Sequence, residues 1–184
     1  LTTHIKLKNI VKKINKKNYI YKKIIALDET LKKDFGLNKP KILISGINPH
    51  SGENGLLGTE ENIILKPAIN KLKRKGILIH GPESPDSILI KSNINKYDCF
   101  LFIYHDQALI PYKFISNFEG LNFTGNLDIL RISPDHGTAY NLVGKNKANP
   151  SSLIKCFNIL SYIIKNRKKY EIKKKITRAK LSSR

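Results

Sequence analysis

The residues with the clearest chemical potential lie in one stretch of this sequence, residues 104–149. His105 and Asp106 belong to the segment YHDQ (104–107), which comes directly after the apolar run 99–103. Two cations, an amide and a glycine-containing turn follow, in the order Lys113, Asn122, Arg131 and residues 133–139. A histidine, an acid and two cations within one segment predict a site for an anionic substrate.

Two buried strands must position these residues. An apolar run bounded by polar residues, such as 99–103, is typical of a strand in a parallel sheet. Residues 41–47 form a second such run, and the loop that follows it carries His50 between Pro49 and two glycines. Open α/β folds bind ligands at the carboxyl ends of their strands. His50 and His105 are therefore predicted to share one edge of the sheet.

Histidines at such an edge can be metal ligands or merely exposed side chains. Imidazole is a ready ligand for zinc and similar divalent ions, and three protein ligands with an open position make a catalytic site. His4 is the third candidate if it also ends a strand. The plainer interpretation is an exposed loop side chain for His50 and a frayed terminal one for His4. No short ligand pair such as His-x-x-x-His adds support for metal binding.

Strands and helices alternate along the chain, which predicts an α/β fold with a mainly parallel sheet flanked by helices. The tail of a strand is predicted over residues 1–4, and strands are predicted over residues 41–47, 77–79 and 99–103. Helices are predicted over residues 8–14, 19–35, 59–75 with a kink at Pro67, from Pro85 onwards with Ser84 as cap, and 151–164. Residues 1–164 are expected to form one catalytic and cofactor-binding portion. The basic residues 165–184 are predicted to be frayed helix or disordered.

The net charge of +20 would ordinarily indicate a nucleic-acid or membrane partner. Here the lysines are spread over nearly every segment, beside many isoleucines and asparagines, a composition typical of AT-rich codon usage. The aromatic residues do not form the stacking platform of single-strand binders. No apolar run reaches the ~20 residues of a membrane helix, and the first residues lack the apolar core of a secretory signal. We expect no nucleic-acid or membrane partner.

The two cysteines, Cys99 and Cys156, make a poor disulfide framework and are expected to fill the core in a reducing, cytoplasmic compartment. The chain has no methionine and begins within sequence that is typical of folded structure. Truncation of an upstream part is therefore expected.

Six motifs, in order along nearly the whole chain, resemble the 4-hydroxythreonine-4-phosphate dehydrogenase family, the NAD-dependent enzymes of pyridoxal 5'-phosphate biosynthesis. They are TTH (2–4), GINPHSGENGLLGTEE (46–61), GPESPDS (81–87), YHDQALIPYK (104–113), GLNFTGN (120–126) and RISPDHGTA (131–139). The resemblance implies the carboxyl-terminal part of such an enzyme. It also implies a homodimer and an isocitrate/isopropylmalate dehydrogenase-like fold whose amino-terminal portion is missing.

The reaction that the resemblance implies is oxidation of the secondary alcohol of 4-phosphooxy-L-threonine by NAD. The resulting β-keto acid loses carbon dioxide to leave 3-amino-2-oxopropyl phosphate. By resemblance, His4, His50 and His105 hold a divalent cation (Zn, Mg or Co) at a site shared between two subunits. A cation on the hydroxyl oxygen would lower its pKa and stabilise the ketone oxygen and the enolate.

The other site residues also follow from the resemblance. Lys113, Asn122 and Arg131 match substrate-binding residues, and the arginine fork and the lysine point charge suit a carboxylate and a phosphate. Lys113 is also a catalytic candidate, together with Asp86 and Asp106. The two acids are expected to handle protons or to orient a metal ligand.

Residues 135–150 are similar to the adenosine-binding loop of isopropylmalate and isocitrate dehydrogenases. The NAD-binding candidates by this similarity are His136, Gly137, Ala139 and Asn149, and Gly137 is expected to let the backbone approach the nucleotide. Because the sequence has no G-x-G-x-x-G, a Rossmann domain is not implied. The plainer interpretation of the segment is a turn that caps the following helix.

Two alternatives stay open. A paralogue could act on another phosphorylated hydroxy acid, such as a four-carbon sugar-acid phosphate, with the same apparatus. A truncated, non-catalytic remnant could keep the fold without the chemistry, because the family's upstream half, with a His-Thr pair that helps bind the substrate, is missing from this sequence.

Overall fold

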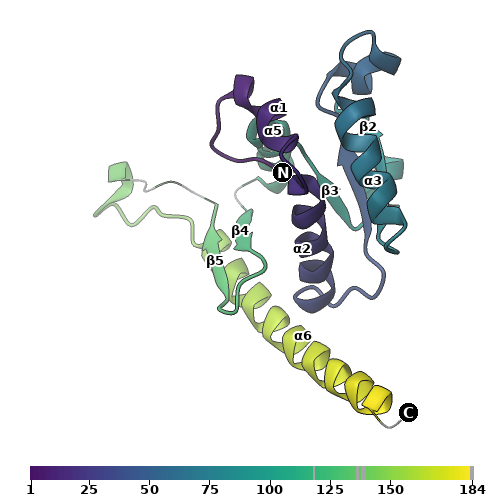
Figure 1. The fold of residues 1–184 in the computed structure, drawn as a ribbon. Helices are drawn as coiled ribbons and strands as arrows, with labels where there is room; N and C mark the ends of the chain where they lie inside the picture. Colours follow the sequence, from purple (N-terminus) through teal and green to yellow (C-terminus); the bar gives the residue numbers. More distant parts are fainter. Residues whose placement is uncertain (118, 136, 138–139, 183–184) are drawn as a thin grey trace. The chain divides into compact units, whose positions relative to one another are not determined.

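The computed structural model describes residues 1–117, 119–135, 137 and 140–182, which form two compact units (Figure 1). The first unit comprises Leu1–Asp28 and Asn38–Pro111, and the second comprises Glu29–Leu37 and Tyr112–Arg184. Two helices, α2 (Tyr19–Lys33) and α5 (His105–Ser116), contribute residues to both units.

A three-stranded parallel sheet forms the centre of the first unit. The middle strand β1 (Lys41–Ser45) pairs with β2 (Leu78–Glu83) on one side and β3 (Cys99–Leu101) on the other. Ile42, Leu43 and Ile44 of β1 are at most 1% exposed, as expected of a strand that is covered on both faces. Since both pairings are parallel, the carboxyl ends of the three strands lie at one edge of the sheet.

The segments around the strands of the first unit are largely helical. They are η1 (Leu7–Asn9), α1 (Ile10–Ile14), the first part of α2, η2 (Pro49–Gly55), η3 (Glu61–Leu65), α3 (Lys66–Lys73) and α4 (Lys91–Ile94). Helix α3 lies along β2, with Ile69 and Leu72 buried (Figure 1). η3 is a π-helical turn that passes into α3 next to Pro67. The irregularity predicted at this proline is therefore present.

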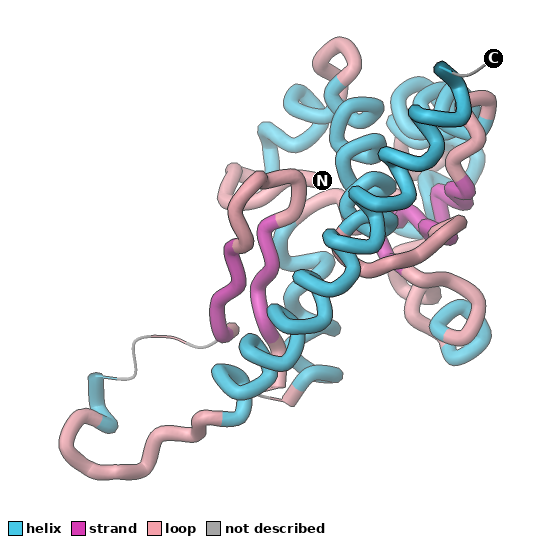
Figure 2. The backbone as a smooth tube through the Cα atoms, turned by 90° about the horizontal axis from the view of Figure 1, so that it is seen from below, coloured by secondary structure: helices cyan, strands magenta, loops and turns pink. Residues whose placement is uncertain are grey.

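The second unit is an antiparallel hairpin on a long helix. Strands β4 (Leu121–Thr124) and β5 (Arg131–Pro134) pair with each other and lie against the amino-terminal part of α6 (Ser151–Ser182), as Figures 1 and 2 show. The short turn η4 (Tyr140–Leu142) lies between β5 and α6. The buried Ser152 fastens the hairpin to the helix, because its hydroxyl donates to Gly120 O at 2.5 Å and accepts from Asp135 N at 3.3 Å.

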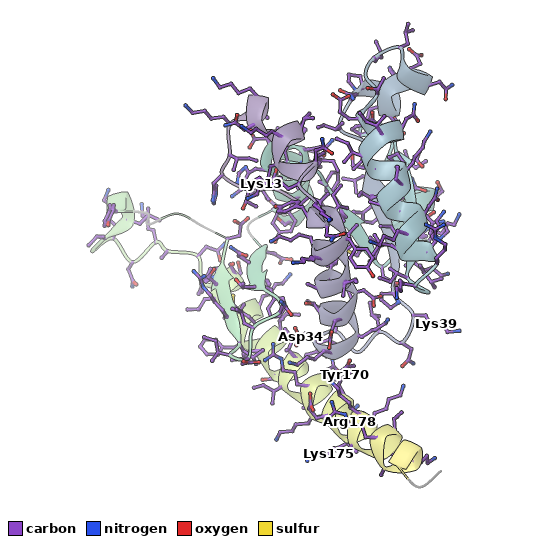
Figure 3. The ribbon with its side chains drawn as sticks, in the orientation of Figure 1. Lys13, Asp34, Lys39, Tyr170, Lys175 and Arg178 are labelled. Carbon is purple, nitrogen blue, oxygen red and sulfur yellow. The ribbon has the colours of Figure 1, made fainter. Side chains whose placement is uncertain are left out.

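Arg167 makes a second attachment within this unit. Its Nε donates to Asp34 Oδ1 at 2.6 Å, and its two terminal nitrogens donate to Asp128 O at 2.9 Å and to Leu127 O at 3.1 Å. Asp34, labelled in Figure 3, is 1% exposed. Helix α6 thereby holds both the end of the α2 segment and the turn of the hairpin.

The sequence predicts a helix as far as residue 164 and a frayed or disordered tail; in the structure one helix runs on to Ser182. Residues 171–180 are exposed, and Lys175 and Arg178 are labelled on this part in Figure 3. Among the described residues, no helix is both long and apolar enough to cross a membrane.

Three details of the first unit differ from the sequence-based expectations. The helix predicted from Pro85 is wrong: residues 85–89 form turns, and α4 begins only at Lys91. The strand predicted over 77–79 continues through Pro82, which the ladder tolerates because β2 is an edge strand. Residues 1–5 are not a strand, although Thr2 N and Thr2 Oγ1 both donate to Ile103 O, at 3.0 and 2.8 Å.

Candidate active site

The carboxyl edge of the parallel sheet is held together by hydrogen bonds between the segments that leave the three strands. Gly46 N donates to Glu83 O at 2.8 Å, which joins the segments after β1 and β2. Ser51 Oγ donates to Pro82 O at 3.2 Å across the same gap. Gln107 Nε2 donates to Gly46 O at 2.8 Å, which joins α5 to the end of β1. The loops that carry His50, Asp86 and His105 thus belong to one connected edge.

His4 and His105 lie side by side at this edge. Their ring centroids are 5.2 Å apart with an interplanar angle of 42°, and both rings line a small cavity of about 80 Å³ together with Thr2 and Tyr104. Thr2 keeps the amino-terminal segment next to the end of β3 through its two bonds to Ile103. The prediction that His4 ends a strand is wrong in form, but this pairing still brings its ring to that of His105.

Asp106 contacts the ring of His105. Nδ1 of His105 lies 2.7 Å from Asp106 Oδ1, at the first turn of α5. A carboxylate on one imidazole nitrogen orients the ring and leaves the other nitrogen available. Nε2 of His105 is therefore the atom suited to a ligand.

His50 lies on a left-handed turn. Consecutive residues His50 to Asn54 have φ values of 50°, 52°, 78°, 43° and 58°. A left-handed conformation costs about 1–2 kcal/mol for each residue other than glycine, so outside contacts must hold this turn. The side chain of His50 is 62% exposed, and its Nδ1 lies 3.9 Å from Asp86 Oδ2.

Asp86 lies in the turn after β2. Ser84 Oγ donates to Asp86 Oδ1 at 2.6 Å. This hydrogen bond, with a smaller contribution from the nearby His50, lowers the pKa of the Asp86 carboxyl below its ordinary value. Asp86 is therefore suited to act as an ionised partner of the imidazole.

Imidazoles, with carboxylates that contact them, are side chains from which divalent-cation sites are built. His4 and His105 are adjacent, and His50 follows the neighbouring strand. Among the described residues, however, no three His, Cys, Asp or Glu side chains lie close enough together to hold one ion. A single chain therefore brings together two of the three predicted ligands, and the complete ligand set stays a prediction.

The predicted substrate residues all lie in the second unit. In the hairpin Asn122 pairs with Ser133, and Thr124 pairs with Arg131, so Asn122 and Arg131 share one face of the ribbon. That face is the more exposed one, whereas Phe123 and Ile132 on the other face are half-buried. Lys113 Nζ lies 3.4 Å from the Asp135 carboxylate, directly after β5. The unit thus has an exposed polar face with a cation, as an anion-binding surface requires.

The predicted cofactor residues give a mixed result. His136 and Ala139 lie outside the described residues. A side chain added at Gly137 would meet nothing within 4 Å, so the structure gives no packing reason for a glycine there. The side-chain oxygen of Asn149 accepts from Ser151 N at 2.9 Å, at the start of α6. Asn149 therefore has the helix-capping contact of the plainer interpretation.

The sequence gives no role to Gln107, and Glu61 is only one residue of the helix predicted over residues 59–75. In the structure Gln107 bridges two strand ends, because its side chain donates to Gly46 O and accepts from Ile103 N at 2.8 Å. Glu61 accepts hydrogen bonds from the loop before His50. The signal for Gln107 is its place within the YHDQ motif, whereas nothing in the local sequence separates Glu61 from its neighbour Glu60.

Comparisons with known proteins agree with this arrangement. The family described as "Pyridoxal phosphate biosynthetic protein PdxA" matches residues 1–160. The 4-hydroxythreonine-4-phosphate dehydrogenase of Bacteroides thetaiotaomicron is 37% identical over 169 residues, which are 92% of this chain and 46% of that protein. The D-threonate 4-phosphate dehydrogenase of Pectobacterium atrosepticum is 37% identical over 153 residues, 83% of this chain and 46% of that protein.

Among solved structures, a 4-hydroxythreonine-4-phosphate dehydrogenase from Klebsiella pneumoniae matches with a TM-score of 0.75 at 34% identity. The match covers 90% of this chain and 49% of that one. The chain therefore spans about half the length of the curated relatives that it matches.

The parallel sheet with its histidine-bearing carboxyl edge is that of an α/β protein with the isocitrate/isopropylmalate dehydrogenase-like fold, as the sequence predicts. The match over residues 1–160 then gives the particular family. The chain belongs to the family of the pyridoxal phosphate biosynthetic protein PdxA.

Proposed function

We propose that this chain serves in the NAD-dependent oxidation and decarboxylation of 4-phosphooxy-L-threonine to 3-amino-2-oxopropyl phosphate. The observation that carries the proposal is the adjacent pair His4 and His105, with Asp106 on His105, at the carboxyl edge of the parallel sheet. Relatives named 4-hydroxythreonine-4-phosphate dehydrogenase support it. Because the chain spans about half of those relatives, the complete activity is part of the proposal.

In this proposal His4, His50 and His105 hold a divalent cation, which is Zn, Mg or Co. When bound, the cation supplies Lewis acidity at the substrate hydroxyl and at the ketone oxygen that replaces it. Asp106 contacts Nδ1 of His105 and so leaves Nε2 of that ring for the cation. Asp86, whose pKa is lowered, orients His50 or accepts a proton from the hydroxyl group.

The phosphate and carboxylate of the substrate require cations, which the second unit carries. Arg131 offers a planar fork and Lys113 a point charge, and the amide of Asn122 lies on the same hairpin face as Arg131. Asp135 pairs with Lys113 here, so an anionic substrate would have to compete with this carboxylate. NAD supplies the hydride acceptor when bound, with His136, Gly137, Ala139 and Asn149 as candidate contacts.

We further propose a homodimer in which the metal site is shared between the two copies. The support is that one chain brings His4 and His105 together, whereas no three possible ligands lie close together among its described residues. Sedimentation of the purified chain with and without a divalent cation tests this assembly. A monomer under both conditions contradicts it.

A second candidate is oxidation of a related sugar-acid phosphate. The relative from Pectobacterium atrosepticum, at 37% identity, is named for D-threonate 4-phosphate. The two substrates differ in carrying an amine or a hydroxyl beside the carboxylate, and the same histidine edge would serve both. Comparison of kcat/KM for the two substrates separates these candidates.

The test of the proposed function combines metal binding with turnover. We expect the chain to bind Co²⁺ with the visible absorption of an imidazole complex and to form NADH from 4-phosphooxy-threonine. Removal of a residue that only contacts a metal ligand weakens metal binding by about 10- to 100-fold. His105→Ala removes a proposed ligand itself and should therefore weaken Co²⁺ binding by more than this. His80→Ala is the matched control, because His80 lies on β2 with its ring against Tyr97.

Each outcome has a definite meaning. Equal loss in His105→Ala and His80→Ala contradicts a specific site. Metal binding without NADH formation from either substrate favours the non-catalytic remnant. The absence of both metal binding and turnover rejects the proposed function.

A further inference from the structure

The turn that carries His50 wraps around one buried carboxylate, that of Glu61. Glu61 is the first residue of η3 and is 1% exposed. Its Oε1 accepts hydrogen bonds from Ile47 N and from Asn48 N, both at 2.8 Å. Its Oε2 accepts from Asn48 Nδ2 at 3.0 Å. One acid therefore satisfies three N–H groups immediately before the left-handed turn.

Two glycines show how closely the turn approaches this carboxylate. A Cβ on Gly52 would lie 2.7 Å from Glu61 Oε2 and 2.6 Å from Gly58 O. A Cβ on Gly46 would lie 3.2 Å from Glu61 Oε1 and 2.5 Å from Ser51 Oγ. At Gly52, where φ is also 78°, both contacts are closer than real Cβ atoms show, so the turn needs glycine there to close around Glu61. At Gly46 a Cβ would press on Ser51 and lie tightly against Glu61.

The neighbouring acid has a different environment. Glu60 Oε2 accepts from the side chain of Asn48 at 2.8 Å, and the Glu60 carboxylate also accepts from the backbone N–H groups of Thr59 and of Glu60 itself, outside the left-handed turn; Glu60 is not buried. Glu61 alone bonds the backbone of the turn. The Glu61 carboxylate is shielded from solvent, and its two oxygens accept hydrogen bonds from three N–H groups of the protein. It is therefore not placed to contact a substrate.

We propose that Glu61 is a positioning residue that fixes the backbone of the left-handed turn and thereby the place of the His50 imidazole. This inference rests on the proposed function in one respect, the role of His50 as a metal ligand. Glu61 holds the backbone N–H groups of Ile47 and Asn48, three and two residues before His50. Ser51 Oγ holds the turn one residue after His50 through Pro82 O. The imidazole is therefore presented at the sheet edge from a turn held on both sides.

The test compares Glu61→Ala and Glu61→Gln with the matched control Glu60→Ala. The first readout needs no metal: hydrogen exchange of the Ile47 and Asn48 amides and the ring resonances of His50, both by NMR. Glu61→Ala should expose both amides and shift the His50 resonances. Glu61→Gln should retain most of the protection, because its amide oxygen can still accept from both N–H groups. Glu60→Ala should leave both signals unchanged.

The second readout is Co²⁺ affinity. Glu61→Ala should weaken it by about 10- to 100-fold, as loss of an outer partner does in metal sites, with a smaller loss in Glu61→Gln and none in Glu60→Ala. A general loss of folding would lower affinity in both Glu61 variants, so far-UV circular dichroism is measured on each. If Glu61→Ala does not fold, the role of Glu61 is judged from Glu61→Gln, which should show a smaller loss of Co²⁺ affinity, against Glu60→Ala, which should show none.

Unchanged amide protection and unchanged His50 resonances in Glu61→Ala overturn the inference. So does a Co²⁺ affinity that falls equally in Glu60→Ala and Glu61→Ala. If the wild-type chain binds no Co²⁺, the proposed function fails, whereas the amide exchange and the His50 resonances still decide the role of Glu61.

Discussion

Two of the three candidate metal ligands share an uncommon backbone conformation. His4 has a φ of 49° and His50 a φ of 50°. Residues other than glycine seldom occupy this left-handed region, and they remain there only when the surrounding structure holds them. Thr2 holds the segment of His4 through Ile103 O, and the turn around Glu61 holds His50. Both imidazoles are therefore positioned by contacts outside their own residues.

At the scale of single residues we predict that Ser84→Ala raises the pKa of the Asp86 carboxyl towards its ordinary value. The Ser84 hydroxyl is the largest cause of the lowered pKa, because it donates to the ionised form. A carboxyl whose pKa is lowered by folding adds stability above its unfolded pKa and loses it as the pH falls through the folded pKa. Ser84→Ala should reduce this contribution.

The measurement is an NMR titration of the side-chain carboxyl carbons in both proteins. Asp98 is the internal reference, because its carboxylate accepts from Lys41 N at the opposite edge of the sheet. An Asp86 pKa that does not change, or an equal shift at Asp98, contradicts the prediction.

At the scale of elements, the attachment of α6 depends on one guanidinium. Arg167 is 14% exposed, and its partner Asp34 is 1% exposed. We predict that Arg167→Ala destabilises the second unit by about 3–5 kcal/mol, because it leaves a buried carboxylate without its cation. Arg167→Lys should recover only part of the loss, since an ammonium cannot reproduce the three-way contact.

Urea unfolding followed through the amide signals of β4 and β5 measures this effect on the second unit. The control Lys168→Ala removes an exposed neighbour on the same helix and should change the free energy by about 0.5 kcal/mol or less. Equal stability of the Arg167→Ala and Lys168→Ala proteins would show that the buried pair does not hold the helix.

The elements also show where sequence patterns succeed. The apolar runs before His50 and His105 predict β1 and β3 because continuous apolar runs are typical of strands in a parallel sheet. The central strand β1 is buried, whereas the edge strand β3 is half-buried. The helix predicted from Pro85 fails, since Ser84 bonds the side chain of Asp86 instead of capping a helix. The hairpin of β4 and β5 has no such continuous run, because one of its faces is exposed.

At the scale of the whole molecule the net charge of +20 makes nonspecific contact with polyanions unavoidable. We predict that binding to a labelled DNA duplex is weak, with a Kd of about 10⁻⁴–10⁻⁶ M at physiological salt, and falls steeply as salt is added. The physical reason is that binding of this kind comes from counterion release and not from recognition of bases. Fluorescence anisotropy over a salt series, with several duplex sequences, measures it.

A Kd in the nanomolar range at physiological salt, with a preference for one sequence, contradicts this prediction. It would make nucleic-acid binding a specific function of the chain. Equal, salt-sensitive binding to all the duplex sequences agrees with AT-rich codon usage as the origin of the charge.

The amino-acid order alone determined the α/β class, the parallel strands and the residues that end them, because buried strands and their terminal motifs are local patterns. Tertiary structure decided which of these residues meet. His4 reaches His105 across about a hundred residues through Thr2 and Ile103. Glu61 and Glu60 are adjacent and chemically identical in sequence, yet only Glu61 is buried against the turn of His50, since burial depends on contacts between distant segments.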